Sequence, residues 1–194
     1  MTRFAPALIF FLLFRATTNA FQFDSWSSGI SVREAMAIAR DKDIPIVKEG
    51  IISVNKHFDP NVMKYVDTAH EFYYQADLLG EHAKVNLIFT PESKFLSTIK
   101  IQWNAPFKDR SFQTKLFQLL TGKYGNYAKK ERQIFYETST WAIDKTNRVS
   151  MRTGGSAIVA EYLDMIAYEQ GQKESKKRQE ANWRQSKDKD ASKF

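Results

Sequence analysis

Residues 70–103 carry the pattern that most restricts the fold, because apolar and polar side chains alternate along two neighbouring runs. This period of two is expected when one face of a β-sheet packs on a core and the other stays in water. The side chains expected to point inward are Val85, Leu87, Phe89, Phe95, Ile99, Ile101 and Trp103. Turns are predicted at 77–81 and at the polar break 91–94, so the segment is expected to form three antiparallel strands. Such a sheet can leave one face uncovered, and we expect function there.

A helix is predicted before these strands, from Ser31 to about Arg40. Ser31 and Glu34 have the spacing of a capping box, in which the two side chains satisfy free backbone amides at a helix start. Its apolar residues follow the helical period and are Val32, Ala35, Met36 and Ala39. The extended lead before it has aromatic anchors at Phe21, Phe23 and Trp26. Between helix and strands we expect short strands or extended pieces at 44–47 and 50–54 and a turn at 58–61.

The same order of elements is predicted a second time. Ser111 is expected to cap a helix that ends near Tyr124, with Gly125 following it in the position that favours glycine. Its inward residues are predicted to be Phe112, Leu116, Leu119 and Leu120. Strands follow at 133–143, 148–153 and 156–164, separated by turns at 144–147 and at Gly154-Gly155.

The predicted fold class is therefore α+β. Two helix-plus-three-strand antiparallel units are expected to share one continuous sheet, with both helices on the same face. The predicted division of the chain is a signal peptide at 1–20, a first unit at 21–104, a second unit at 105–168 and a charged C-terminal helix or disordered tail at 169–194.

This repeated pattern resembles the tandem domains of the β-lactamase-inhibitor-like proteins and of the related small outer-membrane assembly lipoproteins of bacteria. The resemblance is carried by the helix that begins at Ser31, the run LLTGKYG at 119–125 followed by Trp141, and the hairpins closed at 91–94 and 154–155. It covers most of the chain after residue 20. The chain lacks both the disulfide cysteines of the inhibitors and the lipid-modified cysteine of the lipoproteins. The resemblance thus implies a fold rather than a function.

The first 20 residues have the composition of a secretory signal. Arg3 precedes an apolar run at 7–14, and the small residues Thr18 and Ala20 suit a cleavage site after Ala20. The run is shorter than the roughly 20 apolar residues that span a bilayer. The chain has no cysteine, which excludes disulfides and thiol chemistry and favours a bacterial exported protein. We therefore expect a periplasmic or secreted protein.

The charge of the chain does not favour a nucleic-acid partner. The formal net charge is +7, and removal of residues 1–20 takes away Arg3 and Arg15 and no acid, which leaves +5. This excess supports at most weak association with an anionic membrane surface. Residues 169–194 hold eight basic and five acidic residues, with Trp183 and Phe194 as apolar points. A membrane-surface adaptor acting through this tail is one alternative function.

Catalytic patterns are weak in this sequence. His57, His70 and His82 could supply metal ligands, and a metal-dependent enzyme or binder using them is a second alternative, although they lack the spacing of a common metal motif. Glu137 and Glu161 could form a carboxylate pair. No serine lies in a nucleophile elbow, and no glycine motif for phosphate occurs. We therefore predict a non-enzymatic protein without a cofactor or a metal site.

The uncovered face of the sheet is the predicted binding site. If Phe135, Trp141 and Ile143 point inward, the neighbouring residues of the same strand point outward. The candidate binding residues are Lys84, Asn86, Lys100, Gln102, Tyr136, Thr138 and Thr140. Tyrosine among such polar residues suits protein binding, because it offers contact area at a low entropy cost. The expected partner is another envelope or secreted protein.

Overall fold

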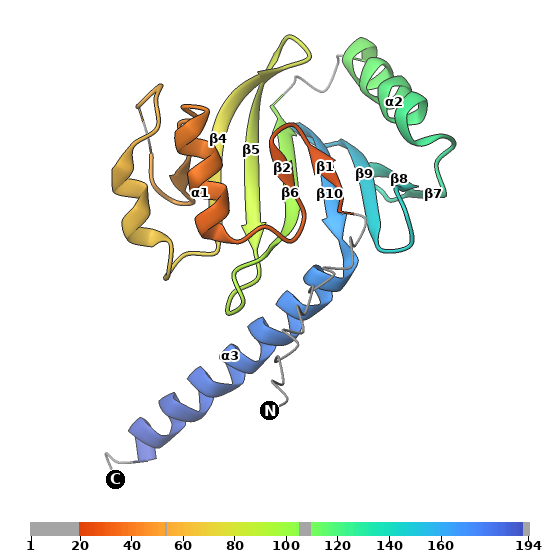
Figure 1. Ribbon diagram of the computed structural model, residues 1–194. Coiled ribbons are helices and arrows are strands. Elements are labelled where there is room, and N and C mark those ends of the chain that lie inside the picture. The colour runs from red at the N-terminus through yellow and green to blue at the C-terminus, as the bar shows by residue number, and fades with distance from the viewer. Residues whose placement is uncertain (1–19, 53, 105–109, 192–194) are drawn as a thin grey trace, which may run out of the picture.

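An eight-stranded antiparallel sheet forms the body of the protein (Figure 1). The computed structural model describes residues 20–52, 54–104 and 110–191. The strands lie in the order β3-β4-β5-β6-β10-β9-β8-β7. Their bounds are β3 Val47–Lys48, β4 Glu71–Leu78, β5 Glu81–Phe89, β6 Leu96–Trp103, β7 Lys129–Arg132, β8 Tyr136–Ala142, β9 Asn147–Gly154 and β10 Ala157–Asp164. The predicted α+β class with one continuous sheet is confirmed.

Three α-helices and a small hairpin accompany the sheet. They are α1 (Val32–Asp41), α2 (Arg110–Tyr124), α3 (Met165–Ala191) and the hairpin of β1 (Gln22–Phe23) with β2 (Trp26–Ser27), and a 3-10 helix, η1, spans Pro60–Tyr65. Figure 1 shows α1 and the β1–β2 hairpin in front of the sheet, while α3 leaves the end of β10 and extends away from it. In the described ranges, no helix has both the length and the apolar character needed to cross a membrane.

The chain passes twice through the order helix and then four strands. The last strands of the two halves, β6 and β10, pair with each other at the centre of the sheet, so the strand order of one half is the reverse of the other. Each half holds one strand more than predicted. The additional strands are β3, which has two residues, and β7, whose four residues are all exposed.

The core lies between the sheet and the two helices α1 and α2. One buried side chain from each of six strands forms a lateral row across the sheet, in the order Phe72, Leu87, Ile99, Tyr162, Val149 and Trp141. From α2, Phe112 packs 5.4 Å from Trp103 between ring centroids, and Phe117 packs 5.4 Å from Trp141. The four predicted inward residues of α1 are buried in the same core. Both helices therefore cover one face, as predicted.

The start of α1 has the predicted capping box. The Ser31 hydroxyl accepts a hydrogen bond from the Glu34 amide at 3.2 Å, and the Glu34 carboxylate accepts one from the Ser31 amide at 2.7 Å. The aromatic anchors of the lead also pack as expected, because Phe21 and Trp26 are buried and Phe23 packs against the core.

Phe95 was predicted to point inward, and this was wrong. It is 45% exposed, whereas Leu96 is fully buried. The cause is a shift in register: Ile88 pairs with Thr98 but Phe89 pairs with Leu96, so Ser97 is an extra residue in β6. Such a bulge reverses the inward and outward alternation of the residues before it.

Three other local predictions also need correction. Phe135 is 78% exposed because it belongs to the turn before β8 rather than to the strand. Leu119 is exposed because the buried side of α2 is formed by residues four positions apart, Phe112, Leu116 and Leu120. Ser111 lies inside α2, which begins at Arg110, so it is not the cap.

The segment 43–67 is also less extended than expected. Among its described residues β3 is the one strand, and η1 occupies most of the region from the predicted turn onward. The C-terminal region, for which helix and disorder were both open, is helical to Ala191. Residues 1–19 of the predicted signal peptide lie outside the described ranges.

Candidate functional site

The seven predicted binding residues lie on the face of the sheet opposite to α1 and α2, which we call the open face. Two lateral rows of paired residues cross it from β5 to β8. One row runs Lys84, Gln102, Val159, Arg152 and Thr138, and the other runs Asn86, Lys100, Glu161, Ser150 and Thr140. Tyr136 follows at the start of β8, opposite Gly154. The structure thus brings together residues from strands that are far apart in the chain.

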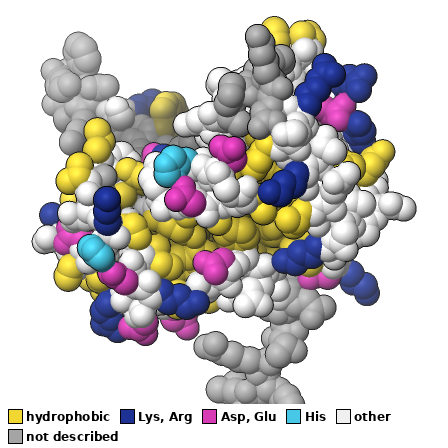
Figure 2. Space-filling model, turned by 90° about the horizontal axis from the view of Figure 1, so that it is seen from above, with side chains coloured by type: hydrophobic (Ala, Val, Ile, Leu, Met, Phe, Trp, Pro, Cys, Tyr) yellow, Lys and Arg dark blue, Asp and Glu magenta, His cyan; other side chains and the backbone are white. Residues whose placement is uncertain are grey.

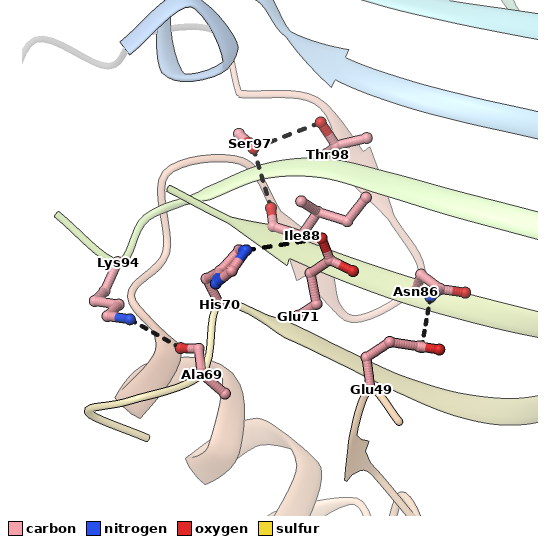
Figure 3. Close-up of polar contacts among 9 residues, drawn as sticks. All are labelled: Glu49, Ala69, His70, Glu71, Asn86, Ile88, Lys94, Ser97 and Thr98. Carbon is pink, nitrogen blue, oxygen red and sulfur yellow. Dashed lines mark hydrogen bonds and ion pairs between the residues drawn. The ribbon is translucent and has the colours of Figure 1, made fainter. Parts of the chain in front are cut away.

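At the β4 side of the open face, the polar groups are already bonded within the protein. The Glu49 carboxylate accepts hydrogen bonds from Lys84 Nζ at 2.8 Å and from Asn86 Nδ2 at 3.0 Å, and Figure 3 shows the second of these. Lys84 Nζ also lies 4.3 Å from the ring centroid of Tyr73, whose hydroxyl donates to the Ile51 carbonyl at 2.7 Å. Lys84 and Asn86 therefore hold the segment after β3 against the sheet, and they are less available to a partner than predicted.

The centre of the open face is different. Lys100, Glu161, Ser150 and Thr140 follow one another across β6, β10, β9 and β8, and we call them the central row. All four are half-buried, and within the part of the chain that the structure describes none of their side chains makes a hydrogen bond or an ion pair. Their polar atoms still reach solvent, since none of them is among the described buried atoms without a partner, so they are available to a second molecule.

Beside the central row lie the remaining candidates. Gln102 Nε2 donates to Asn104 Oδ1 at 3.0 Å, and the Arg152 guanidinium lies 5.5 Å from the centroid of the Tyr136 ring. Thr138 makes no side-chain hydrogen bond to any described residue. Sequence reasoning did not include Glu161, Ser150 and Arg152 among the binding residues, although the alternation that places the threonines outward also places these three outward in β9 and β10.

Two hollows border this face. The first, about 540 Å³, lies at the β4–β5 turn and is lined by Gln75, Asp77, His82, Lys84 and Gln102, among others. The second, about 250 Å³, lies where α3 begins, with Thr98 and Glu161 of the sheet on one side and Tyr168 and Gly171 of α3 on the other. The open face is therefore bounded by concave regions at both of its ends.

The end of the molecule near the β4–β5 turn carries both positive and negative charges. Figure 2, which looks onto this end, shows a band of hydrophobic side chains across its middle with basic and acidic side chains around it. Mixed charges of this kind do not form the single-sign surface that attracts a polyanion.

The three histidines are not brought together. His57 Nδ1 lies 2.6 Å from Asp43 Oδ2, His82 pairs with Asp77, and His70 Nε2 lies 3.8 Å from Glu71 Oε1, as Figure 3 shows. His70 and His82 lie at opposite ends of the β4–β5 hairpin, since Asp77 pairs with His82 and Glu71 begins the strand. Among the residues with described positions, no three His, Asp or Glu side chains are grouped as a metal site.

The carboxylate pair considered from the sequence does not form either. Glu137 shares the buried side of β8 with Trp141, whereas Glu161 lies on the open face, and β9 separates their strands. Hydrogen bonds from Lys130 and Arg132 hold the pKa of the Glu137 carboxyl below its usual value. It is therefore an ionised, paired group rather than a general acid.

Comparison with protein-family models, with curated proteins and with solved structures finds no match to this chain. The resemblance to the tandem inhibitor-like and lipoprotein domains therefore stays a prediction.

Proposed function

We propose that this protein is exported and acts as a non-enzymatic binding protein that docks another protein on its open face. The observation that carries the proposal is the central row, because four half-buried polar side chains without partners span four adjacent strands. A protein partner can form hydrogen bonds with these side chains in place of water. Export is supported by the basic, apolar and small-residue pattern of the first 20 residues.

The chemistry of this surface favours a partner with groups of both charges. Lys100 and Glu161 face each other on β6 and β10, so a basic and an acidic group are presented side by side. Hydroxyl groups of Ser150, Thr138 and Thr140 continue the surface as both donors and acceptors. Complementary charges on the partner would set its orientation more than its affinity.

Tyr136 is the expected anchor of the contact. Its ring is held beneath the Arg152 guanidinium, so a partner that covers it gains apolar area with little loss of side-chain freedom. Lys84 and Asn86 are expected to contribute less, since binding to them competes with their bonds to Glu49.

Site-directed photo-cross-linking tests this proposal. A photoreactive residue replaces Thr138 on the open face, and in a matched control it replaces the exposed Arg40 of α1 on the other side of the molecule. In native envelope we expect a discrete adduct from position 138 only, and we expect its loss when Lys100, Gln102 and Tyr136 are all changed to alanine. The proposal is refuted if both positions give the same adducts, or if the adduct survives the triple change in a protein that unfolds at the wild-type temperature.

A further inference from the structure

The longest helix, α3, projects from the protein as a separate arm (Figure 1). It has 27 residues and is therefore about 40 Å long. Asp164 at the end of β10 begins it, because its carboxylate accepts hydrogen bonds from the amides of Ile166 at 3.0 Å and Ala167 at 3.1 Å. The helix therefore follows the central strand without a linker, and its direction is set by the sheet.

The first turns of α3 are fixed to the turn between β5 and β6. The Glu174 carboxylate accepts hydrogen bonds from the Glu92 amide at 2.7 Å and from the Ser93 hydroxyl at 2.7 Å. Gln170 Nε2 donates to the Ser93 hydroxyl at 3.0 Å. A Cβ on Gly171 would lie 3.5 Å from the Thr90 methyl group, so this side of the helix faces the body.

A line of basic residues runs along α3 beside the side that is anchored to the body. They are Lys173, Lys176, Lys177, Arg184 and Lys187, and we call them the basic stripe. The last four lie three, four, eleven and fourteen positions after Lys173. In a helix with about 3.6 residues per turn, these offsets place all five on one side. Arg178 lies on the other side, where its charge lowers the pKa of Lys94 in addition to the effect of burial.

The charges of the basic stripe are free and exposed. Only one acid, Glu180, lies within it, and no ion pair joins Glu180 to a basic residue in the described part of α3. Trp183 lies at its edge and is 65% exposed, with Lys187 Nζ 5.2 Å from the ring centroid. The basic stripe therefore places several positive charges next to one large amphipathic side chain, Trp183.

We infer that the basic stripe of α3 adsorbs to an anionic phospholipid surface, with Trp183 at the level of the head groups. Basic residues near an anionic membrane attract it additively, and tryptophan prefers the interface. A straight stripe without a hollow suits a flat surface. A protein groove would require apolar anchors at helical spacing, but Trp183 is the one large apolar side chain between Lys173 and Lys187, and the exposed Ile166 and Tyr168 lie at the start of α3 next to the sheet. Insertion would require an apolar face. The contact is therefore electrostatic and reversible, and it is independent of the open-face proposal.

Vesicle co-sedimentation of the full chain tests this inference. We expect binding to vesicles of phosphatidylcholine mixed with phosphatidylglycerol at low salt, and loss of binding at high salt or with phosphatidylcholine alone. Changing Lys173, Lys177 and Arg184 to glutamine should weaken binding about a hundredfold, because each basic residue contributes about fivefold. The matched control changes Lys56, Lys115 and Arg178, which are exposed and lie off the stripe, and should weaken it much less.

Tryptophan fluorescence gives a second, local measurement. The chain has four tryptophans, and Trp26, Trp103 and Trp141 are buried, so quenching by a solute in water reports mainly on Trp183. Mixed vesicles should protect this emission, and a Trp183→Phe variant should show no protection. The inference is overturned if the two triple variants lose binding equally, if salt has no effect, or if the protein binds duplex DNA or polyglutamate more tightly than it binds the mixed vesicles.

Discussion

Gly154 occupies the backbone position that should tolerate substitution least. Its φ is +131°, and a Cβ built there would lie 2.2 Å from the Phe135 carbonyl oxygen and 2.7 Å from the Tyr136 Cα. Carbon and oxygen atoms normally approach no closer than about 3.3 Å, so Gly154→Ala would push the start of β8 away by about 1 Å. The strained φ and the disturbed pairing together should cost about 2–4 kcal/mol, and should lower the melting temperature by roughly 5–15 °C.

Gly155→Ala is the matched control for this prediction. Gly155 also has positive φ, +65°, but no atom lies within 4 Å of a Cβ placed there. Gly155→Ala should therefore lose only the about 1–2 kcal/mol that alanine pays for a left-handed conformation. This loss corresponds to a melting temperature lower by roughly 2–8 °C. Thermal unfolding followed by circular dichroism compares the two variants under identical conditions. If Gly154→Ala melts at the same temperature as Gly155→Ala, the close approach of β8 to the β9–β10 turn is not as described.

Two further predictions concern side-chain hydrogen bonds of α1 and α3. Ser31→Ala should lower the free energy of unfolding by about 1 kcal/mol in chemical denaturation, and Ser31→Asp, which can also cap α1, should restore most of it; an unchanged midpoint in Ser31→Ala would contradict the capping role. Partial burial tends to raise the pKa of Glu174, but hydrogen bonds from Ser93, Glu92 and Gln170 outweigh it and hold the pKa below the usual 4.5. The stability that this group contributes is therefore present above pH 4.5 and lost as the pH falls through the lower, folded value. The protection of the Ser93 amide relative to its intrinsic exchange rate should fall over that range in the wild type but be low at every pH in Glu174→Gln, and equal protection in the two proteins would refute the anchor.

Most of the sheet could be predicted because its signals are local. The alternation in β5, the polar turn after it and the paired glycines before β10 each act within a few residues. The strands at the two edges could not be predicted in this way. Residues 129–132, Lys-Lys-Glu-Arg, have no apolar alternation and pair only because the edge of β8 is available.

In β6, the sequence does not determine which residues point inward. The apolar residues Phe95 and Leu96 are adjacent, so the sequence alone does not decide which of them points inward. The decision depends on the bulge at Ser97, whose hydroxyl donates to the Ile88 carbonyl at 3.1 Å across the strand pair. Only the partner strand β5 fixes this register.

The sequence predicts which residues of the candidate site point outward, but not which of them are free to bind. The outward direction of Lys100 or Thr140 follows from alternation within one strand, so all seven residues were placed on the correct face. Whether each of them is free to bind a partner depends on segments that are far away in the sequence. Glu49, which bonds to Lys84 and Asn86, comes from the region before η1, where the sequence pattern was weakest.

The reversed strand order explains why the central row exists at all. Because β6 and β10 end the two halves and pair at the middle, Lys100 of the first half faces Glu161 of the second. Neither half by itself would present this basic and acidic pair, and a partner bound there would contact both halves at once. The same order makes α3 continue from a central strand, so the arm with the basic stripe begins beside the open face rather than at an edge of the sheet. A protein partner on the open face and a membrane beneath α3 could therefore be held by one rigid sheet.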